Sequence, residues 1–466
     1  MSDRDGLRAA TEKMRSAGQP DEAVRAFAHA YRELRAGASG MLPDAELEPV
    51  RDLPAAADLP AAQRGEALDR AVIIKLNGGL GTSMGMTRAK SLIEARDGLS
   101  FLDVIARQTL ALRRRHGVRV PVLFMDSFRT RGDTLAALSR YPELAGDLPL
   151  DFLQHQEPRI RSDDLHPVDW PRQPALEWCP PGHGDIYTAL KSSGMLGALL
   201  ERGFEYAFLS NADNLGAVLD ADLLGWFAAE GLPFAMEVVV GTHADRKGGH
   251  IARLVSDGRL VLRETAQTPA GDEESFRDFA RWRYYNSNNL WLNLRALEHG
   301  LSAGDGILRL PLIVNRKPVD PSVPGAPEVI QLETAMGAAI GAFDGARAVC
   351  VSRTRFAPVK TTDDLLVLRS DVYELSADAT VEQVPRHGTD LPFVDLDRAF
   401  FARIGDFEAR FASGPPSLVE AERLVVRGDV TFGAGVTVRG AVTVDAGDRS
   451  LTVPDGAVLT GERGAA

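Results

Sequence analysis

Four glycines fall within nine residues of this chain, in a segment that directly follows a short apolar run. The run is AVIIKL (Ala71 to Leu76), and the segment is NGGLGTSMGMTRAKS (Asn77 to Ser91). Glycines let the backbone bend tightly and bring its N–H groups against an anion, and Lys90 closes the segment with a positive charge. The segment therefore predicts a phosphate-binding loop. The competing interpretation is a tight turn without a ligand.

Two better-known phosphate-binding patterns do not fit this loop. A Walker loop ends in Gly-Lys-Ser/Thr, whereas Ala89 precedes Lys90 here. In the dinucleotide fingerprint, counted from Gly79 and Gly81, the third glycine falls on Met84. The loop therefore indicates neither a kinase-type phosphate loop nor a dinucleotide-binding fold.

A second glycine-containing segment, CPPGHGDIY (Cys179 to Tyr187), reads as a rigid loop that opens a helix. The N-terminus of a helix attracts negative charge through its free N–H groups and its dipole. Asp185 fits the N-cap of that helix, a role that does not exclude ligand binding by the loop. His183 stands between two glycines and has room to contact a ligand, although a loop histidine is more often a surface residue.

Carboxylates and amides follow two further apolar runs. SNADNLG (Ser210 to Gly216) places Asp213 at the end of a strand-like segment, where a carboxylate commonly holds Mg²⁺ beside a nucleotide. The alternative is an Asx turn. YYNSNNLWLNL (Tyr284 to Leu294) places three asparagines just before a strand-like run, and amides suit sugar hydroxyls because they offer both donors and acceptors.

A second lysine lies in RFAPVKTTDDLLVL (Arg355 to Leu368). Lys360 follows the rigid Pro358 and precedes a predicted helix whose N-cap is Thr361 or Thr362. Taken alone, Lys360 also fits a solvated surface lysine. These segments together predict a site with two lysines, one carboxylate and several amides.

The elements that must position these side chains alternate between strands and helices. Predicted strands are Ala71 to Leu76, Pro121 to Asp126, Tyr206 to Ser210 and Phe234 to Val240, and predicted helices are Phe101 to Gly117 and Asp185 to Gly203. Such alternation predicts an α/β fold with a mostly parallel, doubly wound sheet covered on both faces. Ligands then bind outside the carboxyl ends of the strands, where the polar loops fall.

The two ends of the chain differ from this middle part. Residues 1–65 read as an amphipathic helical extension followed by a Pro/Ala-rich connection, and packing on the main domain is favoured over a partner-binding arm. Near the other end, Val430, Val436 and Val442 recur every six residues with glycines between them. This period predicts short stacked β-helix coils that pack against the main domain or another subunit.

The composition limits the classes of protein to consider. The chain has 466 residues, which favours two or three domains, and its formal net charge of −12 argues against a nucleic-acid partner. No run approaches the roughly 20 apolar residues of a membrane span, and the N-terminus lacks the apolar core of a secretory signal. Two distant cysteines, Cys179 and Cys350, fit a reducing compartment better than a disulfide scaffold. We expect a cytoplasmic enzyme or binding protein.

The motifs together resemble the eukaryotic-type UTP–glucose-1-phosphate uridylyltransferase (UDP-glucose pyrophosphorylase) family, and the resemblance extends over nearly the whole chain. The matching blocks, in family order, are LNGGLGTSMG (Leu76 to Gly85), KS (Lys90, Ser91), FLD (Phe101 to Asp103), PRI (Pro158 to Ile160), PPGHGD (Pro180 to Asp185), SNADNLGA (Ser210 to Ala217), ADRKGG (Ala244 to Gly249), NNLW (Asn288 to Trp291), QLETAMGAAI (Gln331 to Ile340), RFAPVK (Arg355 to Lys360) and GDVTFG (Gly428 to Gly433).

The resemblance implies three parts: a helical extension (1–65), a Rossmann-like, GT-A-type nucleotidyltransferase domain (66–375), and a C-terminal domain with a short left-handed β-helix (376–466). It implies a reaction in which UTP and glucose 1-phosphate give UDP-glucose and pyrophosphate with Mg²⁺ as cofactor. The implied nucleotide contacts are Leu76, Gly78, Gly79 and Lys90, with Gln154 and Gly182 reading uracil. The implied sugar and phosphate contacts are His183, Lys360, Asn211, Glu264 and Asn289, and the implied metal ligand is Asp213. Lys90, Lys360 and His183 are the residues expected to act in catalysis.

Three departures from the family pattern bear on these expectations. Arg88-Ala89 stands where the family usually has Gly-Pro, which adds a charge near the phosphates. Asp126 stands where the family usually has asparagine. The chain ends soon after Leu459, earlier than in relatives whose last coils lock an octamer, so we expect a monomer or a low-order homo-oligomer.

Other functions remain compatible with the sequence. A glycosyltransferase that consumes a UDP-sugar also needs a glycine-rich nucleotide site and a metal-binding carboxylate, but it gains little from a lysine near a departing pyrophosphate. A non-catalytic UDP-sugar-binding scaffold would not need Lys90, Asp213 and Lys360 together. A uridylyltransferase for another sugar 1-phosphate, such as galactose 1-phosphate or an N-acetylhexosamine 1-phosphate, is not separated from the first hypothesis by the residues alone.

Overall fold

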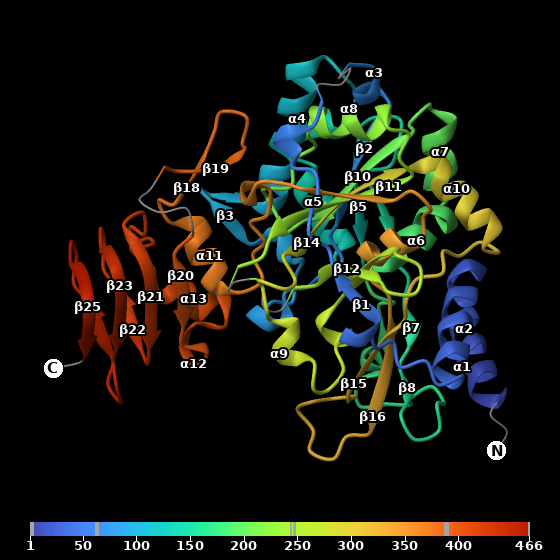
Figure 1. The fold of residues 1–466 in the computed structure, drawn as a ribbon. Coiled ribbons are helices and arrows are strands. Elements are labelled where there is room, and N and C mark those ends of the chain that lie inside the picture. The colour runs from blue at the N-terminus through green and yellow to red at the C-terminus, as the bar shows by residue number, and fades with distance from the viewer. Residues whose placement is uncertain (1–3, 61–64, 243–244, 246–247, 386–390, 465–466) are drawn as a thin grey trace.

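A large mixed β-sheet forms the centre of the molecule in the computed structural model, which describes residues 4–60, 65–242, 245, 248–385 and 391–464 (Figure 1). The strands follow the order β1-β12-β14-β10-β2-β5-β6, while β11 pairs with β14 and β17, and β13 pairs with β12. They are β1 (Leu47–Pro49), β2 (Ala71–Leu76), β5 (Val122–Asp126), β6 (Asp151–Leu153), β10 (Tyr206–Asn211), β11 (Phe234–Val240), β12 (His250–Leu254), β13 (Leu260–Arg263), β14 (Tyr284–Asn293) and β17 (Arg347–Cys350).

The part of the sheet that carries the glycine-rich loop is parallel. β2 pairs in parallel with β10 on one side and with β5 on the other, and β5 pairs in parallel with β6. β14 runs antiparallel to both β10 and β11. Since the carboxyl ends of β2, β5, β6 and β10 meet at one edge, the loops that follow them can form one site.

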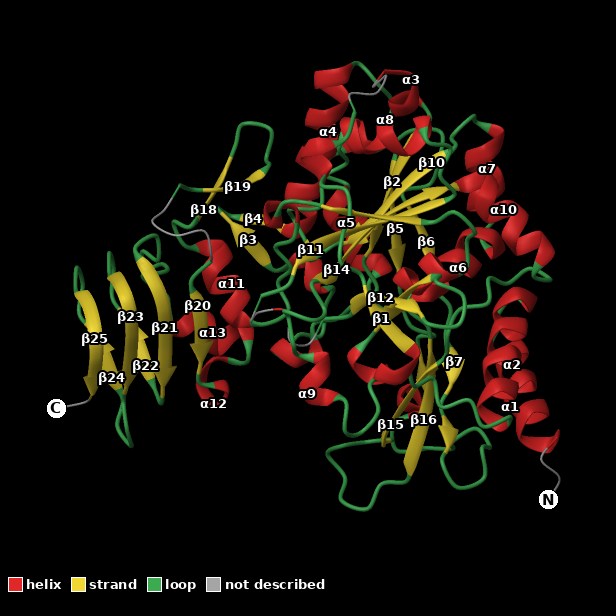
Figure 2. Ribbon diagram, in the orientation of Figure 1, coloured by secondary structure: helices red, strands yellow, loops and turns green. Residues whose placement is uncertain are grey.

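Helices cover both faces of this sheet, as the strand composition predicts (Figure 2). On β2, Ile73 packs with α4 (Phe101–His116) and α8 (Ala221–Ala229), whereas Ile74 packs with α6 (Ile186–Ser192), α7 (Met195–Glu201) and α10 (Leu294–Ala303). Alternate residues of a strand point to opposite faces, so an all-apolar strand must be buried on both. The α/β class and the large central sheet are therefore confirmed.

Two local predictions need correction. The single helix expected between Asp185 and Gly203 is two helices, α6 and α7, separated at Gly194, whose φ of 75° lies in the left-handed region. The asparagines expected before a strand lie inside it, because β14 begins at Tyr284. A register shift at Glu237/Val238 of β11 and a left-handed Asn288 (φ 57°) accommodate them.

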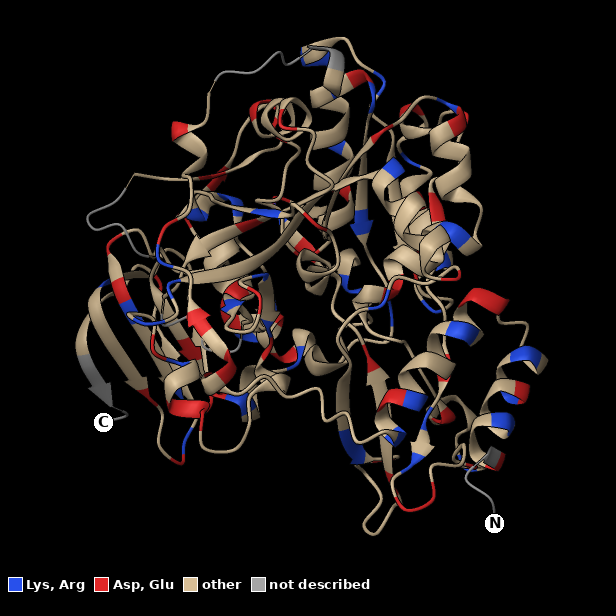
Figure 3. Cartoon of the chain, turned by 45° about the vertical axis from the view of Figure 1, so that its right-hand side comes forward, with Lys and Arg blue, Asp and Glu red and all other residues tan. Residues whose placement is uncertain are grey.

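The N-terminal segment is helical at first and then joins the sheet. α1 (Arg4–Ser16) and α2 (Asp21–Arg35) pack on a small sheet of β15 (Ile313–Pro318), β16 (Glu328–Glu333) and β8 (Ile160–Arg161). Acidic and basic residues are interspersed along these two helices in Figure 3. β1 then pairs with β12, so the extension contributes an edge strand. None of the described helices is long and apolar enough to cross a membrane.

The C-terminal part stacks short parallel strands at the opposite end of the molecule from α1 and α2 (Figure 1). β20 (Phe393–Leu396), β21 (Ala421–Arg427), β23 (Thr437–Asp445) and β25 (Val458–Gly464) form one parallel sheet, and β22 (Val430–Phe432) and β24 (Leu451–Val453) form another. Val430, Val436 and Val442 are buried, as their period predicts.

Between this stack and the main sheet lie α11 (Thr362–Arg369), β18 (Tyr373–Leu375), β19 (Val381–Gln383), α12 (Arg398–Phe401) and α13 (Ile404–Arg410). Phe401, Phe407 and Phe411 belong to the same core as α4.

Candidate active site

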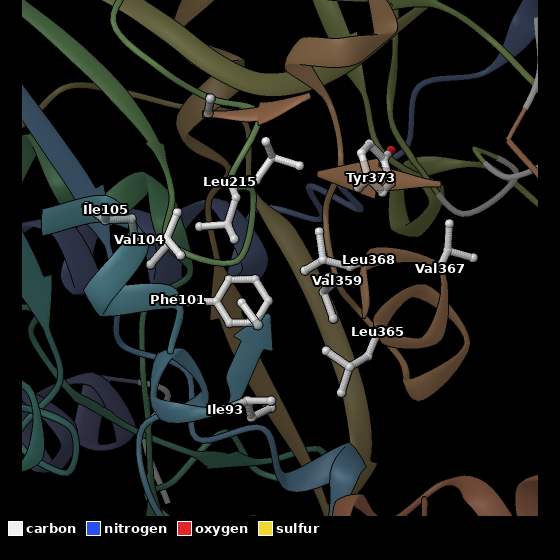
Figure 4. Close-up of a cluster of buried hydrophobic side chains, with 14 of the residues drawn as sticks. Ile93, Phe101, Val104, Ile105, Leu215, Val359, Leu365, Val367, Leu368 and Tyr373 are labelled. Atoms are coloured by element: carbon white, nitrogen blue, oxygen red, sulfur yellow. The ribbon is translucent and has the colours of Figure 1, made fainter. Parts of the chain in front are cut away.

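Three polar segments that are distant in the sequence are attached to one cluster of buried apolar side chains. Figure 4 shows Ile93, Phe101, Leu215 and Val359 in a common cluster of buried side chains. Ile93, Leu215 and Val359 lie within three residues of Lys90, Asp213 and Lys360 respectively. Packing of these neighbours fixes the three loops relative to one another, because buried side chains interdigitate without free space.

Lys90 joins the three loops by direct hydrogen bonds. Its ammonium donates to Asp213 Oδ2 at 2.7 Å and to the carbonyl oxygen of Val359, and its backbone N–H donates to the Gly79 carbonyl at 3.0 Å. The N–H of Val359 donates to the Asp213 carbonyl at 3.0 Å. The structure therefore brings together the predicted residues Lys90 and Asp213 and the segment that ends at Lys360.

The glycine-rich loop uses its glycines in different ways. Gly81 and Gly85 have φ values of 63° and 73°, which residues other than glycine rarely adopt. A Cβ on Gly78 would lie 2.7 Å from Gln154 Oε1, whereas the space around Gly79 is open. Gly78 thus allows close approach of two loops, and Gly79 leaves room beside the end of β2, which finishes at Leu76.

The segment around Gly182 lies near the glycine-rich loop, to which Gln154 connects it. Gln154 Nε2 donates to the Gly182 carbonyl at 3.0 Å, which places the predicted uracil contacts side by side. His183 accepts the N–H of Met336 at its Nδ1 (2.9 Å). Burial, helped by the nearby Lys360 ammonium, lowers the pKa of His183 to about 4. His183 is therefore neutral near pH 7 and, with Nδ1 accepting, carries its hydrogen on Nε2.

Asp185 does not cap the helix that it begins. No side-chain capping bond forms there, and its carboxylate instead accepts two hydrogen bonds from His155, one from the backbone N–H and one from Nδ1, both at 2.8 Å. The cap expected at the other helix is present, because Thr361 and Asp364 form a capping box at the start of α11.

The predicted sugar contacts fall into two groups. Glu264 faces Lys360, whose charge lowers the pKa of the carboxyl while burial, the larger influence, raises it. A Cβ on Gly249 would meet Glu264 Oε2 at 2.7 Å, so the glycine leaves space for that carboxylate. Asn211 is half-buried at the end of β10. These two residues border the same side of the sheet as the lysines.

Asn289 lies in a different environment from the one predicted. It is fully buried, its Nδ2 donates to Glu237 Oε2 (3.0 Å) and to the Arg355 carbonyl (3.1 Å), and its Oδ1 accepts from Asn214 (3.2 Å). These bonds occupy its donors and hold it in the interior. The neighbouring Asn288 is only half-buried and has the left-handed backbone, so it is the amide of this segment that the structure leaves accessible.

Sequence reasoning missed two buried charges beneath the loops. Glu237 lies inside the strand FAMEVVV and binds Arg355, whose Nε and Nη2 donate at 2.8 and 2.6 Å. Lys75 lies inside AVIIKL and donates to Ser210 Oγ and the Ala217 carbonyl at 2.8 and 2.7 Å, and burial lowers its pKa to about 7. The available signal was a charged residue inside an otherwise apolar strand, which must find a partner when buried.

Asp126, one of the departures from the family pattern, supports the first residue of the glycine-rich loop. Its Oδ1 accepts from Asn77 Nδ2 at 2.8 Å and from Thr134 Oγ1 at 3.1 Å, whereas its Oδ2 has no hydrogen-bond partner among the described residues. Burial, helped by the nearby Asp151, raises the pKa of Asp126 to about 6. The Asp126 carboxyl therefore binds its proton more tightly in the native state than in the unfolded chain.

We expect Asp126→Asn to remove a pH-dependent loss of stability. Since the folded pKa is raised, the contribution of Asp126 is favourable at low pH and is lost as the pH rises through about 6. Relative to the parent chain, the variant should gain about 1 kcal/mol in unfolding free energy between pH 5 and pH 8. Urea unfolding at both pH values measures this gain. An equal difference at the two pH values would contradict it.

The donor set around Asp213 fits a single-carboxylate metal site. Asp213 Oδ2 is held by Lys90, its side chain is partly exposed, and the loops beside it leave room for phosphate oxygens. Among the described residues, no group of three or more His, Cys, Asp or Glu side chains is arranged to hold a metal ion. Mg²⁺ commonly takes one or two carboxylates and completes its shell with phosphate and water, so this environment is compatible with it.

A glycine-rich loop at the carboxyl end of a parallel strand, with two lysines and a carboxylate beside it, defines an α/β enzyme that acts on phosphorylated nucleotides. The family model described as UTP–glucose-1-phosphate uridylyltransferase matches residues 25–439. The potato (Solanum tuberosum) enzyme of that name is 42% identical over 401 residues, which is 85% of this chain and 82% of the relative. A probable UTP–glucose-1-phosphate uridylyltransferase of Schizosaccharomyces pombe is 40% identical over 84% of this chain and 76% of its own length.

Solved structures agree with these relatives. A mutant UDP-glucose pyrophosphorylase from Leishmania major in complex with UDP-glucose superposes with a TM-score of 0.94 at 42% identity, covering 99% of both chains. A UDP-glucose phosphorylase from Trypanosoma brucei gives a TM-score of 0.93 at 41% identity, covering 99% of this chain and all of that one. This chain belongs to the UTP–glucose-1-phosphate uridylyltransferase family. Of the family block ADRKGG, Ala244, Arg246 and Lys247 lie outside the described residues.

Proposed function

We propose that this protein transfers the uridylyl group of UTP to glucose 1-phosphate, giving UDP-glucose and pyrophosphate. The observation that carries the proposal is the convergence of Lys90, Asp213 and the Lys360 segment beside the glycine-rich loop. A phosphate oxygen of glucose 1-phosphate attacks the α-phosphorus of UTP in line. The bond from the α-phosphorus to the bridging oxygen breaks, and pyrophosphate leaves with that electron pair.

The reaction needs positioning and charge neutralisation more than proton transfer. The attacking phosphate oxygen is already anionic at neutral pH, so no general base is required. The low pKa of His183 keeps its imidazole neutral near pH 7. A neutral imidazole acts as a hydrogen-bond donor to phosphate or sugar oxygens. Mg²⁺ held by Asp213 would neutralise phosphate charge when bound. Lys90 and Lys360 supply the remaining positive charge.

We assign the substrate contacts by position around this centre. Leu76, Gly78 and Gly79 line the nucleotide, and Gln154 and Gly182 read the uracil base. Asn211 and Glu264 bind glucose hydroxyls, and the accessible Asn288 takes this role in place of the interior Asn289. A neutral amide that pairs with uracil rejects bases that would leave it unpaired.

The proposal extends to architecture and setting. We propose a doubly wound, GT-A-type catalytic domain (66–375) preceded by the extension (1–65), and a C-terminal domain (376–466) whose stacked strands form a left-handed β-helix. We also propose a cytoplasmic monomer or low-order homo-oligomer. The parallel pairing of β21 with β23 and of β23 with β25 supports the stacked coil.

Pyrophosphate release in the presence of Mg²⁺ tests the proposed function. With glucose 1-phosphate, we expect turnover with UTP and at least about 100-fold lower kcat/KM with ATP and GTP, because a site built around an amide discriminates by this order or more. A panel including dTTP, galactose 1-phosphate and N-acetylglucosamine 1-phosphate defines the breadth of the site. Consumption of UDP-glucose without pyrophosphate chemistry would instead identify a glycosyltransferase, and binding without turnover would identify a scaffold.

A further inference from the structure

Three linked side chains, two of them buried, lie next to the proposed uracil contacts and have no role in the reaction described above. Asp185 accepts from the backbone N–H and Nδ1 of His155, each at 2.8 Å, and His155 Nε2 lies 2.8 Å from Ser192 Oγ. Asp185 and His155 are 5% and 8% exposed. One tautomer satisfies all three bonds: Nδ1–H donates to the carboxylate and Nε2 accepts from the serine.

The connection of this chain to the nucleotide site is direct. His155 follows Gln154, and Asp185 lies three residues after Gly182. The Gln154 amide nitrogen donates to the Gly182 carbonyl at 3.0 Å. The two segments are therefore joined by this bond and by the two bonds between His155 and Asp185. Two bonds from one residue to one carboxylate fix both the distance and the angle between the segments.

This arrangement decides which end of the Gln154 amide is available to a base. With Nε2 engaged by Gly182, Oε1 is directed toward Gly78, where a Cβ would lie 2.7 Å from it. A carbonyl oxygen held in this orientation accepts the N3–H of uracil but faces the lone pair on N3 of cytosine. If the Gln154 and Gly182 segments moved apart, Nε2 would be released and the amide could turn to pair with either base.

We propose that His155 and Asp185 are positioning residues for nucleotide selection: their pair holds Gln154 in the orientation that accepts uracil and excludes cytosine. The inference rests on the proposed use of UTP. We assign neither side chain a contact with the base, because His155 and Asp185 are bonded to each other and His155 also to Ser192. The effect of losing them is therefore expected on the KM for nucleotide and on the UTP/CTP ratio, with little effect on the KM for glucose 1-phosphate.

The test compares His155→Ala and His155→Asn with the parent chain in pyrophosphate release with UTP and with CTP. His155→Ala removes the side-chain bond to Asp185, and we expect a kcat/KM for UTP lower by about 10- to 100-fold, since displacements near 1 Å cost this much. The UTP/CTP ratio should fall by about 10-fold. His155→Asn can still donate an amide N–H to Asp185 and should recover most of both. His166→Ala, a histidine outside this chain of contacts, should leave both values unchanged.

The outcomes separate this inference from the function on which it rests. Failure of the parent chain to turn over UTP would overturn the proposed function. An active parent together with a folded His155→Ala that keeps the parent ratio would overturn the positioning role. If His155→Ala does not fold, Asp185→Asn replaces it: an unchanged UTP/CTP ratio in that variant overturns the inference, and a lowered ratio supports it. A fall in kcat/KM with UTP and CTP in equal proportion keeps the parent ratio and would likewise overturn the positioning role.

Discussion

Replacing Lys360 by alanine is expected to lower kcat/KM for UDP-glucose formation by about 10²- to 10³-fold, or roughly 3–4 kcal/mol of transition-state stabilisation. The Lys360 side chain is exposed. Burial lowers the pKa of His183, helped by the Lys360 charge, and burial raises the pKa of Glu264, opposed by that same charge, so Lys360 lies near both the proposed phosphate and the proposed sugar contacts. Charge accumulates on the phosphoryl oxygens during the transfer. An ammonium fixed there stabilises the transition state more than the separated substrates.

The fold should tolerate this substitution. The backbone N–H of Lys360 donates to Asp364 Oδ2 at 2.8 Å, and the capping box of α11 uses Thr361 and Asp364, so neither contact needs the lysine side chain. Steady-state pyrophosphate release and thermal unfolding measure the two effects separately. Lys360→Arg keeps the charge and should lose less activity, and Lys317→Ala on β15 serves as the control. Near-normal turnover of Lys360→Ala would remove this residue from the mechanism.

Glu237→Ala is expected to lower the free energy of unfolding by about 3–5 kcal/mol, because it removes the carboxylate that accepts two hydrogen bonds from the largely buried Arg355 guanidinium and leaves it the more distant Asp220 carboxylate at 3.8 Å. Glu237 is fully buried and accepts four hydrogen bonds: two from Arg355, one from Asn289 and one from Trp291 Nε1 at 3.0 Å. Arg355 begins the segment that ends at Lys360. Loss of Glu237 should therefore also reduce activity under conditions where the chain remains folded.

Urea unfolding with activity measured below the transition tests this prediction. Glu230→Ala removes an exposed carboxylate that follows α8 and should change stability by less than about 0.5 kcal/mol. Glu237→Gln keeps the shape and some of the hydrogen bonds, so its loss should be smaller than that of the alanine variant. A loss below about 1 kcal/mol for Glu237→Ala would mean that water or a side-chain rearrangement satisfies Arg355.

The strands were the most predictable part of the fold. β2 and β11 have the bounds expected from their apolar runs, because strands buried on both faces differ sharply in composition from their flanks. The break at Gly194 and the edge strand at Leu47–Pro49 were not predictable, since each depends on the packing of distant segments. Helix periodicity continues through a glycine, and a strand of three residues has no pattern of its own.

The candidate site shows the same division. The placement of Lys90 and Asp213 in loops of the candidate site was predictable, because glycines and a strand end mark those loops. The structure places Lys90 Nζ 2.7 Å from Asp213 Oδ2. The interior position of Asn289 was not predictable, because the choice between Asn288 and Asn289 depends on a local irregularity opposite Glu237. His155 gave no signal in the sequence. Its proposed role rests on the three-dimensional proximity of Asp185 and Ser192.

The hydrogen bonds of Lys90 have a consequence for how the protein acquires activity during folding. Its two ammonium bonds reach residues 123 and 269 positions away, so each closes a long loop of chain. Contacts of such separation form late, because the chain loses the entropy of loop closure before the contact stabilises it. On refolding from urea, helix content should therefore recover before turnover does. A catalytic assay would then report the last step of folding, the docking of the segment around Val359 onto the glycine-rich loop.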